Sequence, residues 1–424
     1  MVERHPPSPK REDENQSHGR LRVKPAMTIQ RKSLVLVERI KEKLMKETTA
    51  IGLMSGSSLD GLDIALVRFA VEGADKTCAN PEYRFQILQA ETLPYPEHWK
   101  KQLAEAFQQQ PQDLVQLDKD YGKYLGEQVR NFAQKHNAKP DFVASHGHTI
   151  FHRPEEHYTL QIGDGQALAN ACGFTVVNDF RTEDVSKGGQ GAPLVPIGDK
   201  LLFGDYEMCL NIGGIANISY DENGKRIAYD LCIANQALNY LAQMEGLDYD
   251  KDGNLARSGK VDFDLLKKLN NSPFFMQEPP KSLGREYFEM YQKDLLDQGT
   301  RIFNPPYSPF QRENGTRDAD LSIADMLATF VEHIALQIAI PISLLPKGKI
   351  LVTGGGARNK FLMERLQART KHEVIIPKKE IIDYKEALIF AFLGLRRLEG
   401  KTNVLASVTG AESNSCSGKI WKND

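Results

Sequence analysis

Two stretches of the chain repeat one pattern, in which a short apolar run is followed by a glycine-rich turn and a second apolar run. In the first stretch, the apolar residues 50–54 and 62–69 flank the turn Ser55-Gly56-Ser57-Ser58. In the second stretch, residues 208–212 and 215–220 flank Gly213-Gly214. Short apolar, β-branched runs bounded by turn residues are typical of strands, so each stretch predicts a strand, a glycine turn and another strand.

Strand-like and helix-like segments alternate along the rest of both halves. Apolar residues at helical spacing predict helices at 113–136, 236–244, 321–345, from 359, and at 384–397. Short β-branched runs predict strands at 83–93, 141–145, 175–178, 226–230, 350–353 and 372–376. This order favours an α/β fold, and two similar halves place a ligand in the cleft between them.

The length of the chain predicts more than one domain, because 424 residues exceed what one hydrophobic core usually serves. We predict an N-terminal domain over residues 47–204 and a C-terminal domain over residues 205–424. Residues 1–46 hold several prolines and twelve basic against six acidic residues, which predicts a disordered tail. The apolar run at 34–37 is too short for a signal peptide.

Composition and charge narrow the class of protein. The net charge of −2 at pH 7 gives no reason to expect a nucleic acid or an acidic membrane as partner. The most apolar segment, residues 334–345, is too short to span a bilayer. The five cysteines are scattered and form no CxxC pair, so we expect a reduced, cytoplasmic protein without disulfides or a cysteine metal site.

The turn at residues 55–60 is a candidate phosphate site. Backbone amides at a tight turn cradle phosphate oxygens, and glycine lets the chain approach them closely. Ser57 and Ser58 add hydroxyl donors, and Asp60 would hold a hydrated Mg²⁺ beside a triphosphate. The alternative is a plain hairpin built from turn-favouring residues.

Common phosphate loops are missing, because no G-x-G-x-x-G follows a strand and Gly400-Lys401-Thr402 lacks the Walker spacing. A phosphate hairpin in each half, together with a glycine-rich strand end, resembles the plan of the sugar-kinase, heat-shock-chaperone and actin superfamily. The nucleotide-binding residues expected on this plan are Gly56, Ser57, Ser58, Leu59, Asp60, Gly61, Leu62, Asp63, Gly213, Gly214, Gly354, Gly355 and Gly356.

Within that superfamily, residues 51–411 resemble the 1,6-anhydro-N-acetylmuramic acid kinases. The matching stretches include IGLMSGSSLDGLD from residue 51, NDFRTEDVSKGGQGAPLVP from 178, LNIGGIANIS from 210, PPKSLGREYF from 279 and VTGGGARN from 352. The chain departs from the family pattern at His148, where relatives have Gln, and at residues 230–235. There Asp-Leu-Cys-Ile-Ala-Asn replaces the usual Asp-Thr-Gly-Pro-Gly-Asn, so this loop lacks the threonine and both glycines of the family pattern.

The resemblance implies a two-domain actin-like (ribonuclease-H-like) ATPase fold with a central cleft. It also implies an ATP- and Mg²⁺-dependent kinase that opens 1,6-anhydro-N-acetylmuramic acid with water and phosphorylates O6, in peptidoglycan recycling, and that forms a homodimer. Asp179, at a predicted strand end, would be the general base and Glu386 would assist it, although each is also explained as a solvated surface carboxylate. Contacts with the sugar would come from His146, Gly189, Gln190 and Gly191.

Two other classes of function remain open. His146 and His148, at i and i+2 of a strand, would point to one face and, with His152 and His157, resemble the ligands of a metal-dependent hydrolase. The altered loop at 230–235 is consistent with a non-catalytic relative that binds a muramyl sugar or a nucleotide.

Overall fold

The computed structural model divides the chain into two units. Met1–Lys46 with Glu72–Pro81 form one unit, and Glu47–Val71 with Glu82–Asp424 form the other. The residues that the structure describes are 46–56, 59, 61–72, 82–300 and 321–423. The predicted disordered tail therefore lies outside the described residues, apart from Lys46, and so do Ser57, Ser58 and Asp60.

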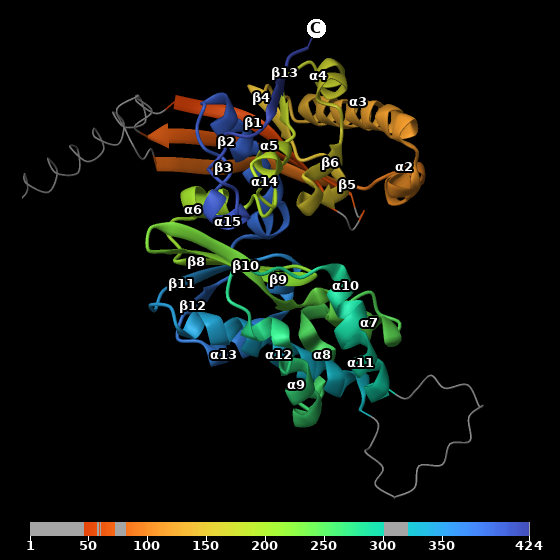
Figure 1. Ribbon diagram of the computed structural model, residues 1–424, viewed down its shortest axis with the longest axis vertical. Helices are drawn as coiled ribbons and strands as arrows, with labels where there is room; N and C mark the ends of the chain where they lie inside the picture. Colours follow the sequence, from red (N-terminus) through yellow and green to blue (C-terminus); the bar gives the residue numbers. More distant parts are fainter. Residues whose placement is uncertain (1–45, 57–58, 60, 73–81, 301–320, 424) are drawn as a thin grey trace, which may run out of the picture. The chain divides into compact units, whose positions relative to one another are not determined.

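The first sheet has six strands in the order β13-β7-β4-β1-β2-β3 (Figure 1). Its strands are β1 (Lys46–Ser55), β2 (Leu62–Glu72), β3 (Glu82–Leu93), β4 (Phe142–Ser145), β7 (Val176–Asn178) and β13 (Lys419–Trp421). β4 runs parallel to both β1 and β7, whereas β13 is antiparallel to β7. A separate hairpin pairs β5 (His148–Arg153) with β6 (Tyr158–Ile162).

The second sheet repeats this order with five strands, β10-β9-β8-β11-β12. Its strands are β8 (Met208–Ile212), β9 (Ile215–Glu222), β10 (Lys225–Ile233), β11 (Lys349–Thr353) and β12 (Glu373–Ile375). β8–β9–β10 form an antiparallel meander, and β11 lies parallel to both β8 and β12. In each sheet the first strand therefore lies between the second and the fourth. This duplicated order confirms the predicted two-domain, actin-like (ribonuclease-H-like) architecture.

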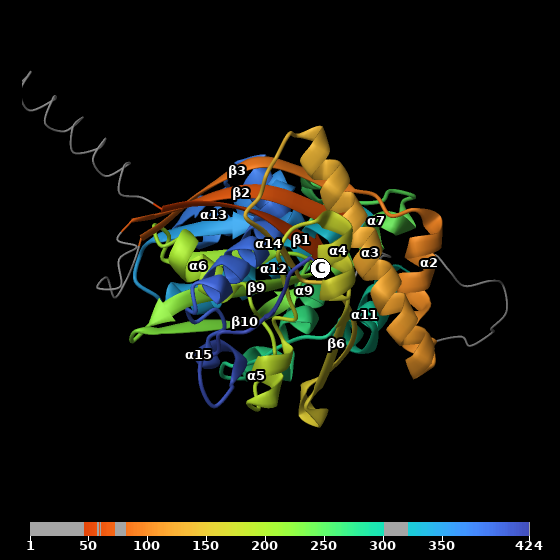
Figure 2. The same cartoon turned by 90° about the horizontal axis from the view of Figure 1, so that it is seen from above.

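Each sheet has its own group of helices. In the first half, α3 (Pro111–Lys135) packs along α4 (Gly165–Cys172), which contacts β7, and α2 (Glu97–Glu105) precedes them (Figures 1 and 2). In the second half, α12 is surrounded by other helices and contacts β10. The helices of this half include α7 (Asn235–Met244), α8 (Asn254–Ser258), α9 (Phe263–Asn270), α10 (Arg285–Tyr287), α11 (Lys293–Thr300), α12 (Ile323–Ser343) and α13 (Lys360–Arg369).

Two helices contact both sheets. α14 (Lys379–Leu398) packs on β3, β4 and β7 of the first sheet and on β11 of the second. α6 (Pro196–Leu202) contacts β3 on one side and β9 and β10 on the other. α14 lies so close to β1 that a Cβ on Gly52 would sit 1.9 Å from the carbonyl oxygen of Ala387. Side chains of α14 are therefore positioned by both halves at once.

Helix α12 is apolar and long enough, at 21 residues, to cross a membrane by length and composition alone. It is longer than the apolar segment 334–345 that the sequence singled out. However, 78% of its most apolar window is buried inside the protein, which is what a core helix requires.

The predicted helices and strands are found close to their expected positions, which confirms the α/β class. The second sheet begins at Met208, shortly after the predicted boundary at 204/205, while β13 lies in the C-terminal range yet joins the first sheet. The exact domain bounds stay a prediction.

Candidate active site

A cavity of about 890 Å³ is lined by residues from both the N-terminal and the C-terminal half of the chain. Its lining includes Met54 at the end of β1, the loop residue Gln190, and Gly213 from the β8–β9 turn. It also includes Gly354 at the end of β11 and Glu386 on α14. Strand ends and glycine turns that are far apart in the sequence therefore meet around one space, as a ligand site requires.

Glycine is required at the end of β11, where the chain enters the cavity wall. Gly354 has φ +80°, and a Cβ there would lie 2.6 Å from the carbonyl oxygen of Ile212. A Cβ on Gly356 would meet the Ile212 side chain at 2.3 Å. The side-chain amide of Asn235 donates a hydrogen bond to the carbonyl of Ile212. Close packing against Ile212 thus requires glycine at positions 354 and 356, and the role of Gly354–Gly356 in binding a nucleotide stays a prediction.

The turn between β8 and β9 is held by the start of α7. The amides of Ala234 and Gln236 donate to the carbonyl of Gly214, and the amide of Asn235 donates to the carbonyl of Gly213. Asn235 survives from the family pattern, and its backbone fixes the turn although both loop glycines are lost. Gly213 lines the cavity, and Gly355 follows Gly354 in the short turn of 3₁₀ helix after β11.

The first hairpin turn is only partly described, because Ser57, Ser58 and Asp60 fall outside the described residues. Gly56 follows β1, Gly61 precedes β2, and Leu62 and Asp63 open that strand. Leu59 has φ +59°, and its amide lies 3.4 Å from the carbonyl oxygen of Gly56. The Asp63 carboxylate accepts a hydrogen bond from the hydroxyl of Thr92 at 2.6 Å.

A buried chain of hydrogen bonds supports Ser55, the first residue of that turn. The Ser55 hydroxyl lies 2.9 Å from Nδ1 of His148 and accepts a hydrogen bond from Tyr95, whose hydroxyl pairs with that of Tyr121. Burial lowers the pKa of His148 to about 4, so the imidazole is neutral near pH 7. The residue that departs from the family pattern is therefore a supporting side chain beneath the turn.

Asp179 directly follows β7, at the end of a strand as predicted. Its backbone is left-handed, with φ +58°, and its carboxylate oxygens lie 2.8 Å from Nζ of Lys419 and 3.4 Å from the amide of Thr182. Lys419 belongs to β13, so residues from the far end of the sequence orient this carboxylate. Asp179 is not among the cavity-lining residues, whereas Arg181, two positions later, is.

Glu386 lines the cavity, and its side chain is exposed there although the protein surrounds the site closely. Burial and the nearby charge of Asp63 raise the pKa of Glu386, while Lys385 and Arg181 oppose that shift. A carboxyl group with a raised pKa accepts a proton more readily than an ordinary carboxylate, which suits a group that assists a base.

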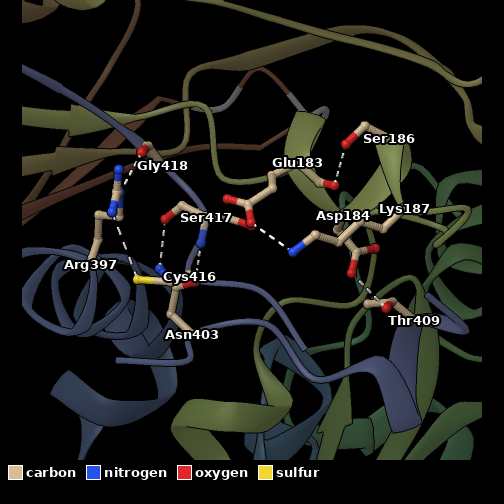
Figure 3. Close-up of polar contacts among 10 residues, drawn as sticks. All are labelled: Glu183, Asp184, Ser186, Lys187, Arg397, Asn403, Thr409, Cys416, Ser417 and Gly418. Carbon is tan, nitrogen blue, oxygen red and sulfur yellow. Dashed lines mark hydrogen bonds and ion pairs between the residues drawn. The ribbon is translucent and has the colours of Figure 1, made fainter. Parts of the chain in front are cut away.

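The predicted sugar-binding loop Gly189-Gln190-Gly191 is held by Asp184, which the sequence did not indicate. Asp184 is fully buried on α5 (Thr182–Ser186); one carboxylate oxygen accepts from the amide of Gly191 and the other from the hydroxyl of Thr409 (Figure 3). A Cβ on Gly189 would lie 2.2 Å from that carboxylate. Gln190 lines the cavity. Asp184 therefore fixes the loop in a position in which Gln190 lines the cavity.

Arg181 is a cavity residue whose side chain the sequence did not assign. His146, predicted to bind sugar, is buried and contacts this arginine: its Nε2 lies 2.8 Å from Nη2 of Arg181. Burial, and then the arginine charge, hold the pKa of His146 well below its usual range. The contact was not visible in the sequence because 35 residues separate the two side chains.

The histidines do not form the set that a metallohydrolase requires. The expectation that His146 and His148 share one strand face is wrong, because β4 ends at Ser145, β5 begins at His148, and Gly147 between them has φ +73°. His152 and His157 contact Thr159 and the carbonyl of Val185, respectively. Within the described part of the chain, no three His, Cys, Asp or Glu side chains are grouped to hold a metal.

Asp230, which survives in the divergent loop, lines the cavity on β10. One carboxylate oxygen accepts a hydrogen bond from the amide of Leu283 at 2.8 Å. Burial nevertheless raises the pKa of Asp230 to about 6, and the hydrogen bond opposes the shift only in part. The folded state thus binds this proton more tightly than the unfolded chain, whose pKa is near 3.8.

We therefore expect Asp230→Asn to change the pH dependence of stability. In the wild type this carboxyl lowers the free energy of unfolding as the pH rises from about 4 to about 6. Relative to the wild type, the variant should gain on the order of 2 kcal/mol between pH 4 and pH 7. Urea unfolding at several pH values measures this, with the exposed Asp248→Asn as control. Parallel curves for Asp230→Asn and wild type would contradict the raised pKa.

The duplicated strand order and the glycine strand ends around one cavity define a protein of the actin-like ATPase class. The chain belongs to the anhydro-N-acetylmuramic acid kinase family, whose model matches residues 48–423. It is 36% identical over 392 residues to the anhydro-N-acetylmuramic acid kinase of Mannheimia succiniciproducens, an alignment that covers 88% of this chain and 98% of that protein. It is 35% identical to the protein of the same name from Pasteurella multocida, covering 89% and 98%.

Solved structures with a partial similarity include the xylulose kinase of Rhodospirillum rubrum. The TM-score is 0.40 at 11% identity, with 89% of this chain and 94% of that chain covered.

Proposed function

We propose that this chain is an ATP-dependent kinase that opens 1,6-anhydro-N-acetylmuramic acid with water and phosphorylates O6. The product is N-acetylmuramic acid 6-phosphate, formed in peptidoglycan recycling. The observation that carries the proposal is membership of the kinase family over residues 48–423. The single cavity that joins Gln190, Gly354 and Glu386 supports it.

The proposed reaction needs a general base, a sugar-binding loop and a nucleotide site. Asp179 takes a proton from a water molecule, which attacks the anomeric carbon; the bond from that carbon to O6 breaks, and O6 receives the γ-phosphoryl group of ATP. Glu386 assists the proton transfer, and Gln190 with its flanking glycines contacts the sugar. The glycines of the β8–β9 turn and the β11 end are assigned to the nucleotide, because glycine lets a backbone approach phosphate oxygens closely.

Mg²⁺ completes the proposal, with Asp60 as its protein contact. A bound Mg²⁺ neutralises the charge that develops on the transferred phosphoryl group. Such ions are usually held by one or two carboxylates together with phosphate oxygens, so a cluster of protein ligands is not required. We also propose a cytoplasmic homodimer that acts on a small molecule, as the family resemblance implies.

The deciding experiment incubates the purified protein with MgATP and 1,6-anhydro-N-acetylmuramic acid and measures product masses. We expect a product heavier than the sugar by one water and one phosphoryl group. Chelation followed by Mg²⁺ alone should restore the reaction, whereas a zinc hydrolase would need Zn²⁺. Binding of sugar or nucleotide without any product would instead identify a non-catalytic relative.

A further inference from the structure

Two cationic side chains in the cavity wall lack a direct ion pair with a described carboxylate. Three cationic side chains line the cavity: Arg181, Lys281 and Lys385. Lys385 pairs with Asp199 at 2.6 Å. Neither Arg181 nor Lys281 forms an ion pair with a described carboxylate. Buried charges are normally paired, so an unpaired cation in a ligand cavity indicates an anionic ligand group.

Arg181 is held in place by neutral acceptors alone. Its Nε and Nη2 lie 3.2 and 2.8 Å from Nε2 of His146, and its Nη1 donates to the carbonyl of Gly191 at 2.6 Å. Because a guanidinium only donates, Nε2 of His146 must accept, which places the imidazole proton on Nδ1. These contacts orient the guanidinium without a direct ion pair in the described part of the chain.

Among the residues that the structure describes, the nearby carboxylates make no direct hydrogen bond to the guanidinium of Arg181. Asp184 and Glu386 act on Arg181 only through space, and both oxygens of Asp184 are engaged by Gly191 and Thr409. Burial lowers the pKa of Arg181 to about 10, so the group remains charged at neutral pH. Three of its five N–H groups donate to His146 and Gly191, and two donors remain for a ligand.

Lys281 is the weaker candidate for the same role. Its ammonium lies 4.8 Å from the ring centroid of Phe274 and 5.8 Å from that of Tyr229, and it donates to the carbonyl of Phe274. The ammonium of Lys281 thus already has cation–π contacts with two rings and a hydrogen bond to a carbonyl. A planar guanidinium also matches the two oxygens of a carboxylate better than an ammonium does.

We propose that Arg181 is a specificity-determining residue that binds the carboxylate of the sugar's lactyl ether group. This inference rests on the proposed function, because that carboxylate is what distinguishes a muramic sugar from the otherwise identical glucosamine sugar. Arg181 lies beside Gly191 of the proposed sugar loop and near Glu386, whereas the glycines of the β8–β9 turn and the β11 end belong to the second sheet. A site that has a half-buried, preoriented arginine discriminates against an analogue that leaves its charge unpaired.

The test compares two substrates that differ only in the lactyl group, 1,6-anhydro-N-acetylmuramic acid and 1,6-anhydro-N-acetylglucosamine. The wild type should favour the acid, and Arg181→Met should lower the ratio of the two kcat/KM values by about 10²-fold or more. Arg181→Lys, which keeps the charge, should restore part of the ratio. Arg257→Met, at an exposed pair with Glu364, is the matched control.

Other outcomes overturn the assignment. An equal loss on both sugars would place Arg181 on the phosphoryl group or in the fold, and a wild type without selectivity would remove the carboxylate site. Lys281→Met reproducing the loss of selectivity would transfer the role to Lys281. Calorimetric binding of the acid sugar without ATP, expected for wild type and at least about 10²-fold weaker for Arg181→Met, decides the matter even if neither sugar is phosphorylated. If the acid sugar binds but neither sugar is phosphorylated, the proposed kinase function is contradicted and the role of Arg181 is not.

Discussion

Asp179→Asn is expected to lower kcat for sugar phosphorylation by about 10²–10⁴-fold, the range that a general base contributes. An amide cannot take the proton from the attacking water. The fold should persist, because asparagine tolerates the left-handed φ of +58° found at this position. ATP affinity, measured by calorimetry, should stay within several-fold of wild type.

The control for this prediction separates the lost base from the lost ion pair. Lys419→Met breaks the same contact but keeps the carboxylate. The Lys419 side chain is 62% exposed, so the pair should contribute at most about 1 kcal/mol to stability. If Asp179→Asn retained wild-type turnover, or if Lys419→Met lost as much activity, Asp179 would not be the base.

Lys385→Met is expected to lower the free energy of unfolding by about 3–5 kcal/mol, because it leaves a buried carboxylate without its counter-ion. Lys385 and Asp199 are 7% and 6% exposed in their side chains, and their charged atoms lie 2.6 Å apart. The second oxygen of Asp199 accepts a hydrogen bond from Ser219, to which Arg226 also donates. The pair joins α14 to α6 between the two sheets, so its loss should also loosen the cavity wall. Chemical denaturation measures the change.

A double-mutant cycle makes this prediction specific. Asp199→Leu alone strands the lysine and should also be costly, whereas the pair of substitutions together should recover much of the loss. Additive losses in the double variant would show that the two side chains do not interact. A single loss below about 1 kcal/mol would indicate that water still reaches the pair.

Much of the architecture followed from local patterns in the sequence. Residues 50–54 and 208–212 lie in the first strand of each sheet, as predicted. Apolar, β-branched runs beside glycine turns are typical of strands. The glycine run at 354–356 also fell at a strand end, next to the cavity. Local signals of this kind depend on neighbours within a few residues, and those neighbours are visible in one sequence.

Contacts between distant segments were not predictable in this way. Nothing in the short run Lys419-Ile420-Trp421 indicates that it pairs with β7. The partnership of Arg181 with His146 depends on Gly147, whose positive φ separates two histidines that periodicity placed together. Buried polar groups such as Asp184 and Asp199 resemble surface carboxylates in sequence, and only their tertiary partners distinguish them.

The pairing of β13 with β7 has a consequence for how the chain folds during synthesis. β7 is complete at Asn178, but its outer edge stays open until Lys419–Trp421 has left the ribosome. During that interval the edge presents unpaired backbone groups, which can pair with another nascent chain. When β13 arrives, the Trp421 indole donates to the Asn178 side chain and Lys419 reaches Asp179. The strand that precedes Asp179 is therefore paired along both edges only after nearly the whole chain has been made.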